Sequence, residues 1–340
     1  MHSDEFFMER CIQLAKLGIG RVAPNPLVGA IIVHNNKIIG EGYHENYGNN
    51  HAEVNAINNV KNASLLKDST IYVSLEPCSH IGKTPPCANL LCEINIKKVV
   101  VGCTDISSKV NGKGIEILRN KGIEVKVGVL ERKCRELNKH FFKFHKKKRP
   151  FILLKWAEST DGFIDKDGKR HNISGIETQT LVHKLRSEYQ GIVVGRKTVE
   201  NDNPNLTVRA YEGQNPTRII IDPMLRLDDS LSIFNKESNT IILNTKKEGS
   251  ENNIEWIKLS IINPKEIIKK LFEKNIQSII IEGGQKTIQS FIDNNLWDET
   301  IIIKSEKIIH KGTKAPELNN LQITKEITFF NDKIFFYKNL

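Results

Sequence analysis

The chain has 340 residues, of which 39% are hydrophobic and 26% charged, and its formal net charge is +10 at pH 7. This length and composition are typical of a soluble globular protein with two domains rather than one. The N-terminal stretch MHSDEFFMERCIQLAKLGIG has early acidic residues and no uninterrupted apolar segment, so it is neither a secretory signal nor a membrane span. We therefore expect a cytoplasmic protein with no membrane partner.

The positive charge alone is compatible with nucleic-acid binding. The lysines, however, are spread among Asn, Ile and Glu, and the densest run, KKKR at 146–149, falls where a linker is expected. A solvated lysine-rich surface explains this distribution, so we expect no nucleic-acid partner. A basic protein also suits anionic small molecules such as phosphorylated sugars and dinucleotides.

Strands and helices alternate in the first half of the chain. LVGAIIVHNNKIIGEGYH, at 27–44, predicts two short strands around an Asn-Asn turn. HAEVNAINNV at 51–60 opens a helix, whereas TIYVSLEPC at 70–78 and KKVVVGCTD at 97–105 are strands. GIEILRNKGIEVKVGVLE at 114–131 then predicts a helix, a turn and a strand. This alternation indicates an α/β sandwich around a mostly buried sheet.

After residue 148 the same alternation begins again. Helices are predicted at 178–189, at 264–275 and after the glycine pair at 283–284. Further strands are predicted in FILLKWAES at 151–159, GIVVG at 191–195, TRIIID at 217–222, TIILN at 240–244, SIIIEGG at 278–284 and ETIIIKS at 299–305. All six cysteines lie in the first 134 residues, and all three tryptophans follow them. We therefore predict two α/β domains, residues 1–147 and 148–340.

The loop PCSHIGKTPPC at 77–87 places two cysteines nine positions apart, downstream of a His-Ala-Glu sequence. Zinc hydrolytic sites use three protein ligands and leave the fourth position to water, and His51, Cys78 and Cys87 supply that number. Glu53 can share the site without binding zinc, and can carry protons from the water to a leaving amine. The set matches the zinc-deaminase signature H-x-E followed by P-C-x-x-C, although eight residues rather than two separate these cysteines.

Other interpretations of these side chains exist. Cys78 and Cys87 could form a disulfide, which the expected compartment disfavours, and His51 could be an ordinary partly buried histidine. His80 lies inside the loop and could compete as a ligand, but we favour a substrate-facing or loop-ordering role. The remaining cysteines are predicted to be small buried hydrophobic residues: Cys11, Cys92, Cys103 and Cys134.

Three motifs resemble the deaminase half of the bifunctional riboflavin-biosynthesis enzymes. They are APNPLVG at 23–29, GEGYHENYGNNHAE at 40–53 and SLEPCSHIGKTPPC at 74–87. The resemblance implies a cytidine-deaminase-like three-layer α/β/α domain, residues 1–147, that uses zinc and acts on a phosphorylated pyrimidine. It also implies that several residues of these motifs lie near the pyrimidine or its phosphate: Asn25, Pro26, His44, His80 and Lys83.

Three motifs in the second half resemble the reductase half of the same enzymes. They are LKWAESTDGFID at 154–165, LRSEYQGIVVGRKTVENDNPNLTVR at 185–209 and IIIEGGQKTIQSF at 279–291. The resemblance implies a dihydrofolate-reductase-like domain that uses NADPH to open a ribose ring to a ribityl chain, and a homo-oligomer built through this domain. Gly283 and Gly284 fit this reading, since a strand-to-helix turn can hold a phosphate on backbone N–H groups. Tight turns also use glycine for other reasons.

By the same resemblance, the reductase motifs assign residues to the substrate and to the nucleotide. The substrate positions are Arg170, Arg186, Leu206, Arg209 and Glu282. The nucleotide positions are Ala157, Asn172, Thr198, Asp202, Gly284, Gln285, Lys286, Thr287, Ile288, Gln289 and Ser290. Lys155, Ser159 and Asp161 are expected to shape the wall of the active site.

Two segments depart from the family pattern. Arg170 and Asn172 replace a serine and a tryptophan; the arginine can still contact a phosphate, but an asparagine cannot stack as tryptophan does. The segment 301–318 is lysine-rich where the family has an apolar, proline-containing pattern. We therefore expect the deaminase site to follow the family more closely than the reductase site does.

The sequence thus predicts a bifunctional enzyme of riboflavin synthesis, a zinc deaminase followed by an NADPH reductase. An alternative is a nucleic-acid or nucleoside deaminase with an accessory C-terminal domain, against which the long rigid loop and the lack of RNA-binding motifs argue. A structural zinc protein is a further alternative, but structural sites use four ligands and need no adjacent glutamate.

Overall fold

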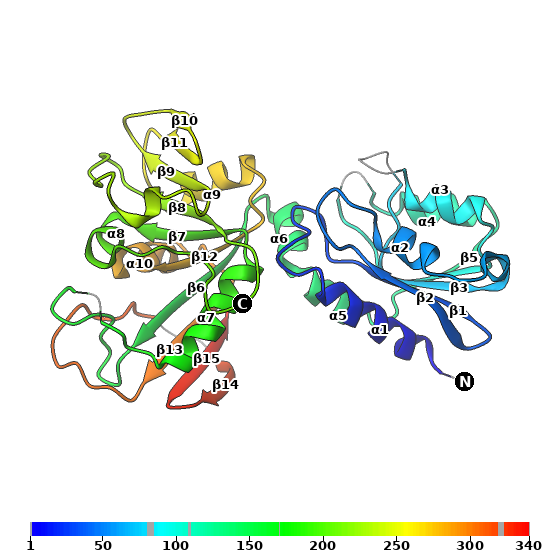
Figure 1. Cartoon of the computed structure of the whole chain (residues 1–340), viewed down its shortest axis with the longest axis horizontal. Helices are drawn as coiled ribbons and strands as arrows, with labels where there is room; N and C mark the ends of the chain where they lie inside the picture. The colour runs from blue at the N-terminus through cyan, green and yellow to red at the C-terminus, as the bar shows by residue number, and fades with distance from the viewer. Residues whose placement is uncertain (1, 80–84, 108–109, 170, 319–322, 340) are drawn as a thin grey trace. The chain divides into compact units, whose positions relative to one another are not determined.

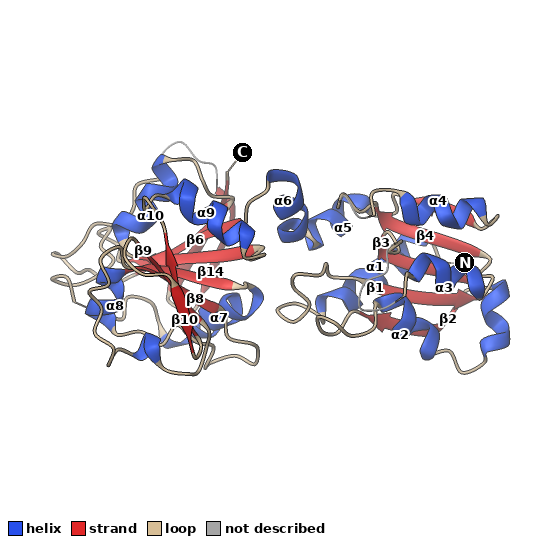
Figure 2. Ribbon diagram, turned by 90° about the horizontal axis from the view of Figure 1, so that it is seen from above, coloured by secondary structure: helices blue, strands red, loops and turns tan. Residues whose placement is uncertain are grey.

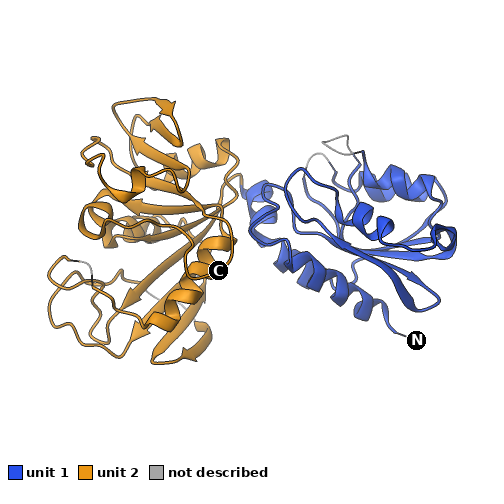
Figure 3. Ribbon diagram, in the orientation of Figure 1, with its two compact units in different colours: residues 1–147 blue, residues 148–340 orange. Residues whose placement is uncertain are grey.

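The computed structural model describes residues 2–79, 85–107, 110–169, 171–318 and 323–339 (Figure 1). His80, Lys83 and Arg170 lie outside the described residues. The chain divides into two compact units, residues 1–147 and residues 148–340 (Figure 3). Within the described ranges, no helix combines the length and the apolar composition that crossing a membrane requires.

Unit 1 is built on a five-stranded sheet with the order β2-β1-β3-β4-β5. Strand β1 pairs antiparallel with β2 and with the central strand β3, and β3, β4 and β5 are parallel to one another. The strands are β1 (Gly29–His34), β2 (Lys37–Tyr43), β3 (Thr70–Leu75), β4 (Lys98–Cys103) and β5 (Glu124–Val127). The predicted hairpin is confirmed: Asn35 and Asn36 both have positive φ, as the tight turns of hairpins require.

Helices cover both faces of this sheet (Figure 1). They are α1 (Asp4–Lys16), α2 (Ala52–Asn58), α3 (Cys87–Glu93), α4 (Lys113–Asn120), α5 (Glu131–Leu137) and α6 (Lys139–Lys147), with a short 3-10 helix η1 (Ala63–Asp68). Because strand side chains alternate, Val99 and Val101 pack with α2, α3 and α4, while Val100 packs with α1 and α5. The predicted three-layer α/β/α architecture is confirmed.

Unit 2 is built on a ten-stranded sheet with the order β10-β11-β9-β8-β7-β12-β6-β13-β15-β14. The run from β11 to β13 is parallel, and β10, β15 and β14 pair antiparallel at its ends. The strands are β6 (Phe151–Glu158), β7 (Gly191–Gly195), β8 (Thr217–Ile221), β9 (Thr240–Asn244), β10 (Gly249–Glu251), β11 (Ile254–Lys258), β12 (Ser278–Gly283), β13 (Glu299–Ser305), β14 (Ile323–Phe329) and β15 (Asp332–Lys338). The four strands β10, β11, β14 and β15 are not among the predicted elements.

Helices again lie on both faces of the sheet (Figure 2). They are α7 (Ile176–Glu188), α8 (Arg196–Asp202), α9 (Pro264–Glu273) and α10 (Gln285–Asp293), with the 3-10 helix η2 (Ser232–Phe234). Residues of α9 and α10 share one apolar cluster, whereas α7 and α8 contribute to two others with the opposite side chains of the strands. Parallel strands buried on both faces explain the runs of isoleucine and valine in the sequence. The α/β fold predicted for this half is also confirmed.

Candidate active sites

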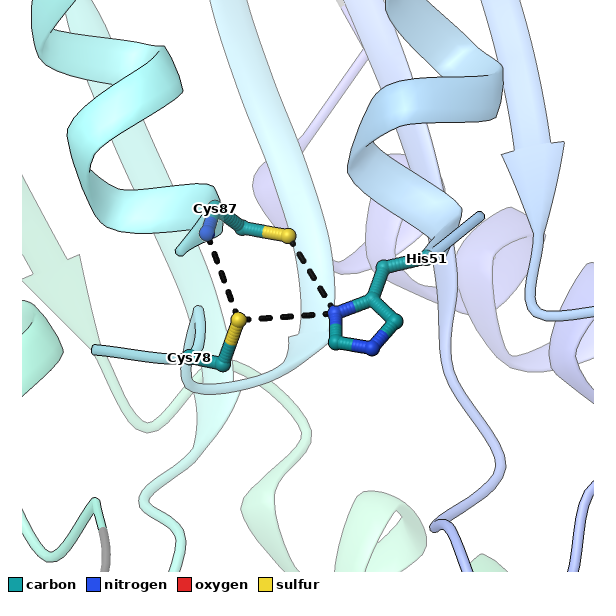
Figure 4. A group of neighbouring side chains, drawn as sticks. All are labelled: His51, Cys78 and Cys87. Carbon is teal, nitrogen blue, oxygen red and sulfur yellow. Dashed lines mark hydrogen bonds between the residues drawn. The ribbon is translucent and has the colours of Figure 1, made fainter. Parts of the chain in front are cut away.

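Three side chains of unit 1 converge on one point (Figure 4). His51 is the residue that precedes α2, Cys78 follows β3, and Cys87 is the first residue of α3. The Nδ1 atom of His51 lies 3.4 Å from the sulfur of Cys78 and 3.3 Å from that of Cys87. The three ligand atoms lie within 4.8 Å of one another, and the described residues form no second group of this kind.

This group fits a zinc ion. Tetrahedral Zn–S and Zn–N bonds would hold a sulfur and a nitrogen about 3.6 Å apart, which is close to the separations in the structure. The thiolate is the form of cysteine that binds metals. Hydrogen bonding from the Cys87 thiol, together with His51, lowers the pKa of Cys78, which favours the thiolate form that a metal needs. His51, Cys78 and Cys87 would therefore hold the metal.

Glu53 lies in the first turn of α2, two residues after the histidine ligand, and is only 3% exposed. Burial, and then the negative charge of Cys78, raise the pKa of its carboxyl to about 7. The carboxyl is also within hydrogen-bonding reach of the Cys87 thiol. A carboxyl group with this pKa beside three metal ligands can both accept and deliver a proton at neutral pH.

A buried carboxylate, Glu76, fixes the end of β3 just before Cys78. It accepts hydrogen bonds at 3.0–3.3 Å from the backbone N–H groups of Asp105, Gly112, Gly114 and Ile115. The backbone of α4 at Gly114 packs closely against Pro77, since a Cβ atom added at Gly114 would lie 2.0 Å from the carbonyl oxygen of Pro77. Glu76 thereby joins the end of β3, and Cys78 with it, to the start of α4. Sequence analysis does not single out this residue, because a glutamate that anchors distant loops has no local signature.

Two predicted substrate positions, Asn25 and His44, lie beside the metal group. The Nδ2 of Asn25 lies 3.0 Å from Nε2 of His44, and Nδ1 of His44 lies 3.0 Å from the carbonyl oxygen of Asn50. Because a carbonyl only accepts, Nδ1 donates and Nε2 is left to accept from Asn25. Burial lowers the pKa of His44, which keeps this neutral form, and its ring meets the edge of the His51 ring at 5.4 Å.

In unit 2, a buried ion pair joins α7 to β12. The guanidinium of Arg186 donates to both carboxylate oxygens of Glu282, at 3.2 and 2.7 Å, and the two side chains are 13% and 8% exposed. Burial raises the pKa of Glu282, but the positive charges of Arg186 and Lys155 outweigh it and lower the pKa to about 2. Burial lowers the pKa of Lys155, against the attraction of Glu282. Glu282 is thus an anion held beside two cations.

The two other substrate positions lie on the loop between α8 and β8. Arg209 donates to the hydroxyl of Thr207 at 2.9 Å, and Arg186 donates to the carbonyl of the same residue at 3.4 Å. Leu206 is 3% exposed, and its side chain packs in the apolar cluster that contains Val199. A substrate contact at Leu206 would therefore come from its backbone.

Two predicted nucleotide positions, Thr198 and Gly284, lie close together where β7 and β12 end. The parallel strands lead directly into α8 and α10, and a Cβ added at Gly284 would lie 3.0 Å from the hydroxyl oxygen of Thr198. A Cβ added at Gly195 would lie 2.6 Å from the hydroxyl oxygen of Thr287. The close approach of these two strand-to-helix turns, each with glycine at the crossing, is suited to an anionic nucleotide.

Other predicted nucleotide positions have side chains that are engaged elsewhere. Ile288 is fully buried in the core, the Gln289 amide bonds to Asp293 and to the backbone of Glu317, and the Ser290 hydroxyl donates to the Thr287 carbonyl. The side chain of Ile288 is therefore not available to a nucleotide. The remaining nucleotide positions lie at the start of α10 (Gln285 and Lys286), at the end of α8 (Asp202) and near the end of β6 (Ala157).

The lysine-rich segment after β13 packs on the loop that follows β6. The carboxylate of Asp161 accepts from the backbone of Ile309 and His310 at 3.1 and 2.7 Å, and from Ser159 at 2.6 Å. The Ser159 hydrogen bond lowers the pKa of Asp161 to about 2. Asn172 is exposed, and its carbonyl accepts from the ammonium of Lys307. The two divergent segments therefore contact each other.

Comparison with known proteins supports both halves of this description. Residues 1–103 match the cytidine and deoxycytidylate deaminase zinc-binding region, and residues 150–323 match the RibD C-terminal domain. The alternative of a nucleic-acid deaminase with an accessory domain is not favoured by the second match.

Full-length relatives share both units. The chain is 39% identical over 339 residues to the riboflavin biosynthesis protein RibD of Aquifex aeolicus, covering 97% of this chain and 95% of the relative. It is 37% identical over 341 residues to that of Synechocystis, covering 96% and 92%.

Solved structures superpose over nearly the whole chain. A diaminohydroxyphosphoribosylaminopyrimidine deaminase/5-amino-6-(5-phosphoribosylamino)uracil reductase from Thermotoga maritima has a TM-score of 0.91 at 36% identity and covers 99% of this chain and 98% of its own. RibD of Acinetobacter baumannii has a TM-score of 0.90 at 30% identity, with 98% of each chain covered. The chain therefore belongs to the RibD family of riboflavin biosynthesis proteins, and it joins a zinc-dependent deaminase to an NADPH-dependent reductase.

Proposed function

We propose that residues 1–147 deaminate a diaminopyrimidine ribosylamine phosphate and that residues 148–340 reduce the ribosyl group of the product to ribityl with NADPH. The Thermotoga relative, which carries both activities in its name, supports this assignment. The observation that carries the deaminase half is the buried Glu53 carboxyl beside His51, Cys78 and Cys87. Three ligands and a separate proton carrier are what hydrolytic removal of an amine needs.

Glu53 is the catalytic residue of the proposed deamination. When bound, zinc supplies an acidified water that is nucleophilic at neutral pH. The Glu53 carboxylate takes one proton from the attacking water and gives it to the ring nitrogen. It then takes the second proton from the hydroxyl group now on the ring carbon and gives it to the amine, which leaves as ammonia. Asn25 binds the pyrimidine, and the neutral His44, which accepts from the Asn25 amide, orients that side chain toward it. His80 is a further substrate contact.

In the proposed reduction the protein binds and orients, while NADPH supplies the hydride. Arg186 and Arg209 bind phosphate or ribityl oxygens through their forked N–H groups, and Glu282 accepts from a ribosyl hydroxyl. The turn at Gly284, with Thr198 beside it, holds the nucleotide, to which Asp202 and Ala157 contribute. Arg170 and Asn172 serve as modified substrate and cofactor contacts.

We further propose that the protein is cytoplasmic and forms a homo-oligomer through unit 2. The homo-oligomer is what the family resemblance of the sequence implies. Sedimentation of the full chain, compared with that of residues 1–147, would test it. A monomeric full chain would contradict it.

A coupled assay tests the proposed function. The diaminopyrimidine phosphate is added to the zinc-loaded protein with NADPH, while ammonia and the absorbance of the nicotinamide are both followed. We expect release of ammonia followed by oxidation of NADPH, and oxidation without ammonia when the deaminated pyrimidine is supplied instead. Ammonia release without any NADPH oxidation would refute the reductase half, and the reverse would refute the deaminase half.

A further inference from the structure

The loop from Asn203 to Arg209 has an unusual backbone. Asn203 and Leu206 both have positive φ, 39° and 55°. Asparagine tolerates the left-handed conformation, but a leucine in it is an outlier that costs free energy. Such a residue persists only where the surrounding structure determines the conformation, and strained residues of this kind cluster at functional sites. The side chains that bond to this loop therefore indicate which function its conformation serves.

Arg218, in β8, holds the first part of the loop. Its side chain is completely buried. Its Nε donates to the carbonyl of Asn205 at 2.8 Å, its Nη1 to the carbonyl of Ile233 at 3.0 Å, and its Nη2 to the side-chain oxygen of Asn235 at 2.7 Å. One guanidinium thus joins the loop to the segment that precedes β9.

A charge at this position is costly for the fold. The ion pair of Arg218 is with Glu237, at 3.9 Å, and the side chain of Glu237 is 57% exposed. Taking a guanidinium out of water costs several kcal/mol unless hydrogen bonds and a close counter-ion offset it. Arg218 is followed in β8 by three isoleucines, 219–221, so it is the one charged side chain of this strand. Only the planar fork of arginine reaches three separate acceptors.

His183, in α7, holds the other end of the loop. Its Nδ1 accepts a hydrogen bond from the backbone N–H of Arg209 at 3.0 Å, and the residue is 5% exposed. Burial, and then the charges of Arg186 and Arg209, lower its pKa to about 4, so Nδ1 stays an acceptor at neutral pH. Between these two points, Arg186 binds the carbonyl of Thr207.

We propose that Arg218 and His183 are positioning residues of the reductase, which hold loop 203–209 in the shape that sets Arg209 beside Arg186. The two arginines meet at Thr207, where one binds the hydroxyl and the other the carbonyl. The inference rests on the proposed function, which assigns both arginines to the pyrimidine substrate. Arg218 is completely buried and His183 is 5% exposed, so in this proposal both act on the substrate through the loop.

The first test compares variants of Arg218 in the full chain. Arg218→Met keeps the length of the side chain and removes every donor, so the KM for the deaminated pyrimidine should rise about 10- to 100-fold through misplacement of Arg209. Arg218→Lys, with one point-like donor group, should lie in between. The KM for NADPH and the deaminase rate of the same chain should not change. Arg226→Met, on the exposed segment after β8, is the control and should match wild type.

The second test uses His183 and does not depend on a stable Arg218 variant. His183→Gln keeps an acceptor for the Arg209 N–H and should retain most of the affinity for the pyrimidine, whereas His183→Leu should lose it about tenfold. An unchanged pyrimidine KM in both Arg218→Met and His183→Leu overturns the inference. A parallel rise of both KM values also overturns it, since that indicates a general loss of structure. Failure of the wild type to oxidise NADPH would instead overturn the proposed function.

Discussion

The two sites differ in what the protein itself supplies. In unit 1 the side chains carry the chemistry: His51, Cys78 and Cys87 offer metal ligands, and Glu53 offers a carboxyl with a pKa of about 7. In unit 2 the cofactor carries the chemistry, and in the function proposed here the chain supplies an ion pair and two strand-to-helix turns that bind and orient the substrate and the cofactor. The first site therefore depends on residue types, and the second on backbone geometry and on residues that fix it.

The comparison predicts that single ligand changes remove one activity and spare the other. Cys78→Ser should lose zinc and all measurable deamination, because two ligands hold the ion far more weakly than three. Oxidation of NADPH with the deaminated pyrimidine should not change, since unit 2 has its own core. Metal analysis and the two rate assays on one preparation measure this.

Cys92→Ser is the matched control for that variant. Cys92 is a partly buried cysteine in α3 that lies outside the metal group. Its replacement should leave zinc content and both rates unchanged. Loss of zinc from this control, or its retention in Cys78→Ser, would mean that the ligands have been wrongly assigned.

The ion pair of unit 2 predicts a dependence of stability on pH. The pKa of Glu282 falls from 4.5 to about 2 on folding, so the stabilisation is complete above pH 4.5 and is lost as the pH falls towards 2. The loss should be about 2 kcal/mol at pH 3 and approach about 3 kcal/mol below pH 2. Calorimetry of wild type and Glu282→Gln between pH 7 and pH 3 measures this loss. The stability of unit 2 should fall less steeply with falling pH in Glu282→Gln than in wild type. The same pH dependence of stability in both proteins would contradict the lowered pKa of Glu282. Glu212→Gln, an exposed change, is the control.

The hydrogen bonds of Glu76 predict a smaller effect, on the stability of unit 1. In Glu76→Gln an amide group replaces one carboxylate oxygen and cannot accept from the backbone N–H groups that it meets. The buried donors left without an acceptor should lower the free energy of unfolding of unit 1 by about 2 kcal/mol. Glu116→Gln, an exposed change in the adjoining helix, is the control for thermal denaturation. Equal melting temperatures of Glu76→Gln and wild type would show that Glu76 does not stabilise the junction between β3 and α4.

The difference between a site that depends on residue types and one that depends on backbone geometry also explains what the sequence can predict. Cysteine and histidine at motif spacing identify a metal site because few other structures need them, and the strands of both units follow from runs of β-branched residues. Glu76, His183 and Arg218 could not be found in this way, since their partners lie far away in the sequence and are mostly backbone groups. The edge strand β14 is not predicted, because its mostly exposed residues do not mark a strand as strongly as a buried run does.

The most direct test of the deaminase account is Glu53→Gln, with zinc content and ammonia release measured on the same sample. The amide fills the same space but cannot carry a proton, so zinc should stay bound while ammonia release falls by about 10²- to 10⁴-fold. Glu93→Gln, an exposed change in α3, should behave like wild type. Near-normal ammonia release from Glu53→Gln, or loss of its zinc, would contradict the role of Glu53 as a proton carrier that does not bind the metal.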